Sequence, residues 1–229
     1  MTFNEKIKSG LFIAVEAVLY IIFICMDLFT GCSSVAIKYF SIILCLIFSF
    51  CLLIKERRPD NILVTTALVG TSVADLFLLV LNDHYLTGVS VFLIVQILYA
   101  LRLIHFDRLH PYIVGARLLL PFMIIISLSI TTDLIAPLTA VTVLYYSNLL
   151  INAFEAWYIR KGHDRMFVFA VGLTLFACCD LCVGLHNMVD FGIDLPVAIT
   201  KIGDYGMWIF YLPAIVLITL SQLRSIENE

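Results

Sequence analysis

Long apolar runs alternate with short polar connections along the whole chain. A helix that crosses a bilayer needs about 20 predominantly apolar residues. We therefore expect an all-α, polytopic membrane bundle. Because no Ser/Gly/Pro-rich linker separates the runs, residues 1–229 are expected to form a single integral membrane domain. The pattern predicts eight transmembrane helices, at residues 10–30, 36–54, 62–81, 86–104, 112–129, 133–159, 165–188 and 197–222.

The composition excludes a water-soluble protein. Hydrophobic residues make up 62% of the chain and charged residues 14%, with a mean hydropathy of +1.05. A soluble domain is about half apolar and about a quarter charged. Much of the surface must therefore face lipid. Basic residues are sparse and dispersed, which argues against a nucleic-acid partner.

The distribution of positive charge predicts how the chain is oriented. With eight spans, all but two of the 14 Lys and Arg residues fall on one side of the membrane, and Lys38 and Lys201 fall on the other. Loops rich in Lys and Arg stay in the cytoplasm. We therefore expect both termini to be cytoplasmic. This pattern, without a transit peptide, is typical of a multi-pass protein of the bacterial plasma membrane.

Two aspartates, Asp75 and Asp180, lie deep inside apolar runs. Ionisable groups in hydrocarbon are costly and often mark a functional site. Each lies about 20 Å along its helix from the cytoplasmic side, at 1.5 Å per residue. Two buried carboxyls at one depth can share a proton, so that one acts as acid while the other is ionised. The same pair could carry protons or cations in a transporter or form an interhelical hydrogen bond, and the pattern leaves these alternatives open.

Other polar residues gather in the same outer layer or within the spans. Interfacial anchoring is the alternative interpretation for those near helix ends. Three polar side chains of the sixth run, Asn148, Asn152 and Glu155, follow i, i+4, i+7 spacing and should share one helix face. The five histidines lie in loops or at helix ends, so a zinc site is not expected. No cofactor is expected either. The candidate substrate-binding residues are Lys38, Gln96, Tyr99, Tyr145, Asn148, Lys201, Asp204 and Tyr211.

Several short blocks follow one another along the chain: Lys38, the stretch from Ala67-Leu68 to Asp75-Leu76, Gly88 with Phe92 and Tyr99, Gly172 with Phe176 and Asp180, and Tyr211. They resemble the blocks of the YhhN-type lysoplasmalogenases, a family of eight-helix membrane proteins that cleave the vinyl ether bond of lysoplasmalogens. The resemblance covers most of the chain from about residue 36 onward. Gln96, however, stands where the family usually has His, Ala74 replaces a Gly, Tyr39 a Pro and Ile215 a Gln.

The resemblance implies a lysophospholipid substrate, no cofactor, and catalysis by Asp75 and Asp180. One carboxyl would protonate the vinyl ether, and the other would stabilise the cation and help water to attack. Lys38 or Lys201 would hold the lipid phosphate. Because Gln96 and Ile215 remove a titratable and a hydrogen-bonding side chain, a non-catalytic lipid-binding protein is a further alternative.

Overall fold

Helices account for nearly all of the chain that the computed structural model describes, which is residues 3–30, 32–107, 111–131, 136–160, 164–187 and 196–223. These residues contain no strand, and all eight predicted helices are present. The all-α fold class is therefore confirmed. The elements are α1 (Phe3–Phe29), α2 (Val35–Lys55), α3 (Pro59–Asp75), the π-helical segment η1 (Leu76–Leu81), α4 (Tyr85–Phe106), α5 (Pro111–Thr131), α6 (Pro137–Ile159), α7 (Asp164–Asn187) and α8 (Val197–Leu220).

Within the described ranges, seven stretches are long and apolar enough to cross a membrane, one of them joining α3 to η1. They indicate an integral membrane protein. The helix missing from this set is α6, whose apolar run is interrupted by Asn148, Asn152 and Glu155. Its crossing of the membrane, like the cytoplasmic placement of the termini, stays a prediction.

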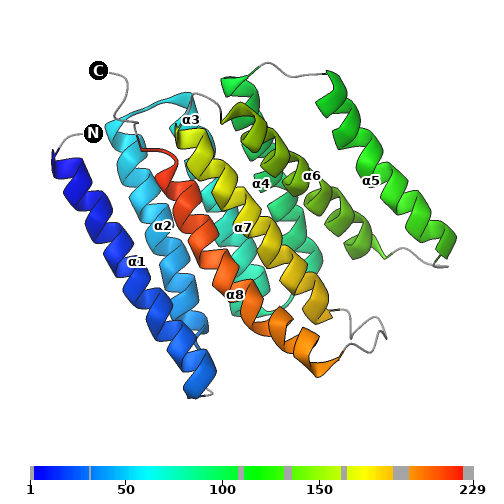
Figure 1. Cartoon of the computed structure of the whole chain (residues 1–229), viewed down its shortest axis with the longest axis horizontal. Coiled ribbons are helices and arrows are strands. Elements are labelled where there is room, and N and C mark those ends of the chain that lie inside the picture. Colours follow the sequence, from blue (N-terminus) through cyan, green and yellow to red (C-terminus); the bar gives the residue numbers. More distant parts are fainter. Residues whose placement is uncertain are drawn as a thin grey trace.

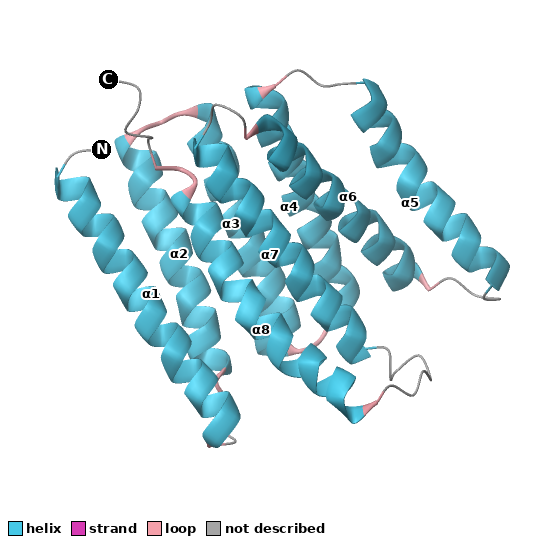
Figure 2. Ribbon diagram, in the orientation of Figure 1, coloured by secondary structure: helices cyan, strands magenta, loops and turns pink. Residues whose placement is uncertain are grey.

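Six helices close into a ring, in the order α2, α3, α4, α6, α7, α8, with α8 returning to α2. Outside the ring, α1 packs against α2 and α8, and α5 packs against α6 (Figure 1, Figure 2). We call the end of the bundle where α1 begins and α8 ends the terminal end, and the opposite end the distal end. Large apolar side chains such as Leu118, Leu119 and Phe122 cover the outer surface of α5, as expected of a face turned to lipid.

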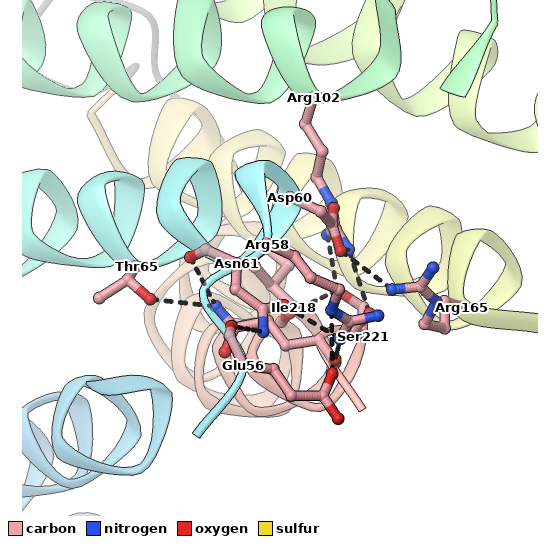
Figure 3. A network of polar contacts seen from close by, with 10 residues as sticks. Glu56, Arg58, Asp60, Asn61, Thr65, Arg102, Arg165, Ile218 and Ser221 are labelled. Atoms are coloured by element: carbon pink, nitrogen blue, oxygen red, sulfur yellow. Dashed lines mark hydrogen bonds and ion pairs between the residues drawn. The ribbon is translucent and has the colours of Figure 1, made fainter. Parts of the chain in front are cut away.

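An arginine buried at the terminal end joins four helices of the ring (Figure 3). Arg102 on α4 is fully buried. Its Nε donates to Asp60 Oδ1 of α3 at 2.6 Å, and its Nη1 donates to Ser221 Oγ, just after α8, at 2.6 Å. Arg165 of α7 also reaches Asp60, at 3.2 Å. The charge pattern had counted Arg102 only among the basic residues of one membrane side, whereas the structure shows it as an internal link.

The predicted polar face of α6 is where α5 attaches to the ring. Arg117 of α5 donates to Asn148 Oδ1 at 3.2 Å, to Asn152 Oδ1 at 2.8 Å and to Glu155 Oε2 at 2.7 Å. The three side chains therefore share one helix face, as their spacing predicted. Charge-assisted bonds of this kind replace the hydrophobic attraction that helices lack in lipid.

The backbones of α7 and α8 come close together at Gly203. A Cβ there would lie 3.0 Å from the amide nitrogen of His186 and 3.1 Å from the carbonyl oxygen of Cys182. We expect Gly203→Ala to lower the free energy of unfolding by about 1–3 kcal/mol, because neither backbone can move without repacking. The measurement is the Tm in detergent. Gly184→Ala on α7 is the matched control, since nothing lies within 4 Å of its Cβ position; equal losses in the two variants would contradict the prediction.

Candidate functional site

The helix that carries Asp75 changes its winding directly after that residue. Whereas the apolar pattern predicted one continuous helix over 62–81, α3 ends at Asp75 and continues as the π-helical segment η1. Such segments occur frequently at functional sites. Gly88 of α4 leaves the room that η1 needs, because a Cβ there would lie 2.5 Å from Leu78 Cγ. The π-helical segment therefore packs closely against α4 at Gly88.

Asp75 and Asp180 lie together inside the ring. Asp75 is the 17th residue of α3, about 25 Å along the helix, and Asp180 has the equivalent position in α7. The side chain of Asp75 is 5% exposed. The two carboxyls are close enough to interact electrostatically. Two helices that are far apart in the sequence thus each contribute one carboxyl to the same site, at the same depth.

Each carboxyl accepts a hydrogen bond from a tyrosine of a different helix. Tyr211 of α8 donates to Asp75 Oδ2 at 2.5 Å. Tyr145 of α6 donates to Asp180 Oδ2. Both tyrosines are buried. The site therefore consists of two Tyr–Asp pairs, contributed by four of the six ring helices.

Aromatic rings connect the two Tyr–Asp pairs. The ring centroid of Phe92 on α4 lies 5.7 Å from that of Tyr145 and 5.7 Å from that of Phe176 on α7. Phe176 in turn lies 5.5 Å from Tyr211, nearly edge to face. Aromatic pairs at this spacing stabilise a fixed mutual orientation. These aromatic contacts therefore hold both phenol groups in place against the carboxyls.

Lys38 lies beside the site and is almost fully buried. Its ammonium forms an ion pair with Asp27 of α1 at 2.7 Å and lies 4.1 Å from the ring centroid of Trp208. Trp208 contacts Tyr211 edge to face, at 5.8 Å between centroids. Asp27 and Trp208 were not among the site residues predicted from the sequence. The structure links Lys38 to Asp75 through Trp208 and Tyr211.

The remaining candidates lie at different distances from the two carboxyls. Lys201 is exposed near the start of α8, at the distal end, and Asp204 pairs there with His186. Gln96 is buried and accepts a hydrogen bond from Asn152 at 3.0 Å. Asn148 turns toward α5 and Arg117, outside the ring, so the structure does not bring it to the aspartates. Tyr99 of α4 is buried, with its ring 5.3 Å from that of Phe169 on α7.

Three residues that depart from the family pattern line the same region. Tyr39 of α2 donates to the backbone carbonyl of Ser72, three residues before Asp75, at 3.3 Å. Ala74 and Ile215 are fully buried in the core. Sequence reasoning recorded these three as substitutions without assigning them a place. The structure thus places Tyr39 and Ala74 close to Asp75 on α3, whereas Ile215 lies in the core one turn after Tyr211 on α8.

Comparison with known proteins identifies the family to which the chain belongs. The model of the YhhN family matches residues 33–222, which include α2 to α8 and with them Lys38, Asp75, Asp180 and Tyr211. No curated protein and no solved structure matches the chain. Because the match covers most of the sequence, the chain belongs to the YhhN family.

Proposed function

We propose that this protein is a membrane-embedded hydrolase of the lysoplasmalogenase type, which cleaves the vinyl ether bond of a lysophospholipid. The main observation behind the proposal is that Asp75 and Asp180 lie at one depth inside the ring and that each accepts a hydrogen bond from a tyrosine. Membership of the YhhN family supports the same activity. The charge pattern further suggests that both termini are cytoplasmic and that the site lies toward the opposite leaflet of a bacterial plasma membrane.

The reaction needs one acid, one base and one water. A protonated carboxyl delivers H⁺ to the outer carbon of the double bond, which leaves an oxocarbenium ion. Water adds to the carbon bonded to the ether oxygen and gives up a proton to the other carboxylate, forming a hemiacetal. The bond from that carbon to the glycerol oxygen then breaks, the oxygen takes a proton, and a fatty aldehyde and a glycerophospho-alcohol leave. No oxidant or reductant is consumed.

Two neighbouring carboxyls suit this chemistry. In an apolar site they do not easily ionise at the same time, so they hold one proton between them. The tyrosines hold Oδ2 of each carboxyl and leave Oδ1 for proton transfer. The second carboxylate also stabilises the positive charge of the oxocarbenium ion in surroundings of low dielectric constant. Asp75 and Asp180 therefore have complementary roles.

Lys38 is the better candidate for the lipid phosphate than Lys201. It is linked to Tyr211 through Trp208, whereas Lys201 is exposed near the start of α8. The phosphate would compete with the carboxylate of Asp27 for the ammonium group. Phosphate contact at Lys38 would place the first part of the alkenyl chain beside the aromatic rings that connect the two Tyr–Asp pairs.

The direct test is to incubate the purified protein in nanodiscs with a lysoplasmalogen and to measure fatty aldehyde. A lysophospholipid with a saturated alkyl ether at the same position is the matched substrate and should release none. If no aldehyde forms but liposomes show proton- or cation-dependent uptake, the transporter alternative is favoured instead. Binding of the lipid without either activity would favour a non-catalytic lipid-binding protein.

Tyr211→Phe should lower kcat roughly 10- to 100-fold, since a hydrogen bond to a charged group contributes about 1.5–3 kcal/mol. The ring and its contacts with Phe176 and Trp208 would remain. Tyr20→Phe is the control, because its hydroxyl donates to the backbone carbonyl of Ile209 at 3.2 Å, away from the carboxyls. Equal kcat values for the two variants would remove Tyr211 from the mechanism.

A further inference from the structure

Buried polar atoms without a hydrogen-bond partner gather where α3 faces α4. Among the described residues, Gln96 Nε2 has no hydrogen-bond partner, and the hydroxyls of Thr71 and Tyr99, which lie beside each other, form no hydrogen bond of good geometry; all three side chains are fully buried. Leaving such a group unsatisfied costs about 1–3 kcal/mol. Proteins normally satisfy it with an internal water, which binds two to four polar groups. These atoms therefore point to water as their ligand.

The position of these atoms relates them to the aspartate pair. Thr71 lies one turn before Asp75 on the same face of α3. The Tyr99 hydroxyl lies beside that of Thr71 and is close enough to Asp75 to interact with it electrostatically. Gln96 lies one turn from Tyr99 on α4. A water at Thr71 and Tyr99 would thus lie next to Asp75.

Contacts with neighbouring side chains leave these polar atoms available. The Tyr99 ring packs edge to face on Phe169, which orients its hydroxyl. The amide oxygen of Gln96 is already occupied by Asn152, so its N–H groups remain as donors. Hydroxyl groups both donate and accept, so Thr71 and Tyr99 can orient a water in either sense.

We propose that Thr71, Tyr99 and Gln96 form a water-binding site in the interior of the bundle, and that it holds the water consumed in hydrolysis. The role of this water in hydrolysis rests on the proposed function. It assigns the roles of the two carboxyls: Asp180 protonates the vinyl ether, and Asp75 takes the proton of the water whose oxygen bonds to the ether carbon. When the hemiacetal collapses, Asp75 returns its proton to the glycerol oxygen, and the hemiacetal hydroxyl restores the proton of Asp180.

X-ray radiolysis with mass spectrometry tests the water site without requiring turnover, because a buried side chain is oxidised only where water lies against it. Tyr99 should be oxidised at a rate within roughly tenfold of that of the exposed Tyr112. Thr71→Val should lower this rate at least threefold. Thr219→Val is the matched control and should not, since the Thr219 hydroxyl is bonded to the Ile215 carbonyl at 2.8 Å. An unoxidised Tyr99, or a rate unaffected by Thr71→Val, would overturn the site.

Kinetics test the role of the water. Thr71→Val and Tyr99→Phe should each lower kcat about tenfold, because one hydrogen bond to the attacking water is worth about 1.4 kcal/mol, and KM for the lipid should stay within about twofold. Thr219→Val should leave both constants unchanged. Loss of Tyr99 oxidation with unchanged kcat would refute the catalytic role. Oxidation of Tyr99 in a protein that releases no aldehyde would refute the proposed function while supporting the water site.

Discussion

Asp75→Asn and Asp180→Asn are each expected to reduce aldehyde release by about 10²–10⁴-fold, the usual contribution of a positioned acid or base. Asparagine keeps the shape of the side chain and can still accept a hydrogen bond from Tyr211 or Tyr145, but it can neither deliver nor take up a proton. The measurement is kcat/KM for a lysoplasmalogen, together with the Tm of each variant. The Tm should change little, because the tyrosine contact survives.

The control for these variants is Asp83→Asn in the connection after η1. The Asp83 side chain is mostly exposed, and its polar contacts among the described residues are with its neighbour His84. The Asp83→Asn variant should therefore have the activity of the native protein. Because the two carboxyls act as one unit, the double variant should lose little more than either single variant. Aldehyde release within tenfold of native by Asp75→Asn or Asp180→Asn would exclude the acid–base assignment.

Asp60→Asn is expected to lower the free energy of unfolding by about 3–5 kcal/mol, because it leaves the charge of Arg102 buried without its partner. Arg102 is fully buried and bonds to Asp60 at 2.6 Å. Arg102→Met should cost less, since Asp60 keeps its contact with Arg165. Unfolding followed by Tm or denaturant in detergent measures both variants.

A more exposed ion pair of the same end provides the comparison. Glu56 and Arg58 form a pair at 3.0 Å, with side chains 31% and 30% exposed. Glu56→Gln should therefore cost only about 0–1 kcal/mol. If Asp60→Asn lowers the free energy of unfolding no more than Glu56→Gln does, Arg102 must find another partner.

The buried pair matters for function because it joins the helices that build the site. Asp60, Arg102, Arg165 and Ser221 belong to α3, α4, α7 and the end of α8. These same helices carry Asp75, Phe92, Asp180 and Tyr211 toward the distal end. Loosening the terminal end should consequently lower activity along with stability.

The sequence by itself determined the number and class of the helices, the depth of the two aspartates and the resemblance to the family whose model matches. These follow from local properties: a run of apolar residues must become a helix in lipid, since each backbone group needs an internal partner. Position within such a run then sets depth at 1.5 Å per residue. The i, i+4, i+7 spacing of Asn148, Asn152 and Glu155 predicted their common face for the same reason.

Only the tertiary structure decided which helix faces meet. In a bilayer, lipid-facing and protein-facing residues are equally apolar, so the pattern along a helix says little about its rotation or its neighbours. The pairing of Tyr211 with Asp75, 136 residues apart, and of Arg102 with Asp60, 42 apart, therefore had no local signal. The contact of Asn148 with Arg117, outside the ring, also had no local signal. The π-helical segment after Asp75 likewise packs against another helix, at Gly88, and the apolar pattern of its own segment had predicted an uninterrupted helix.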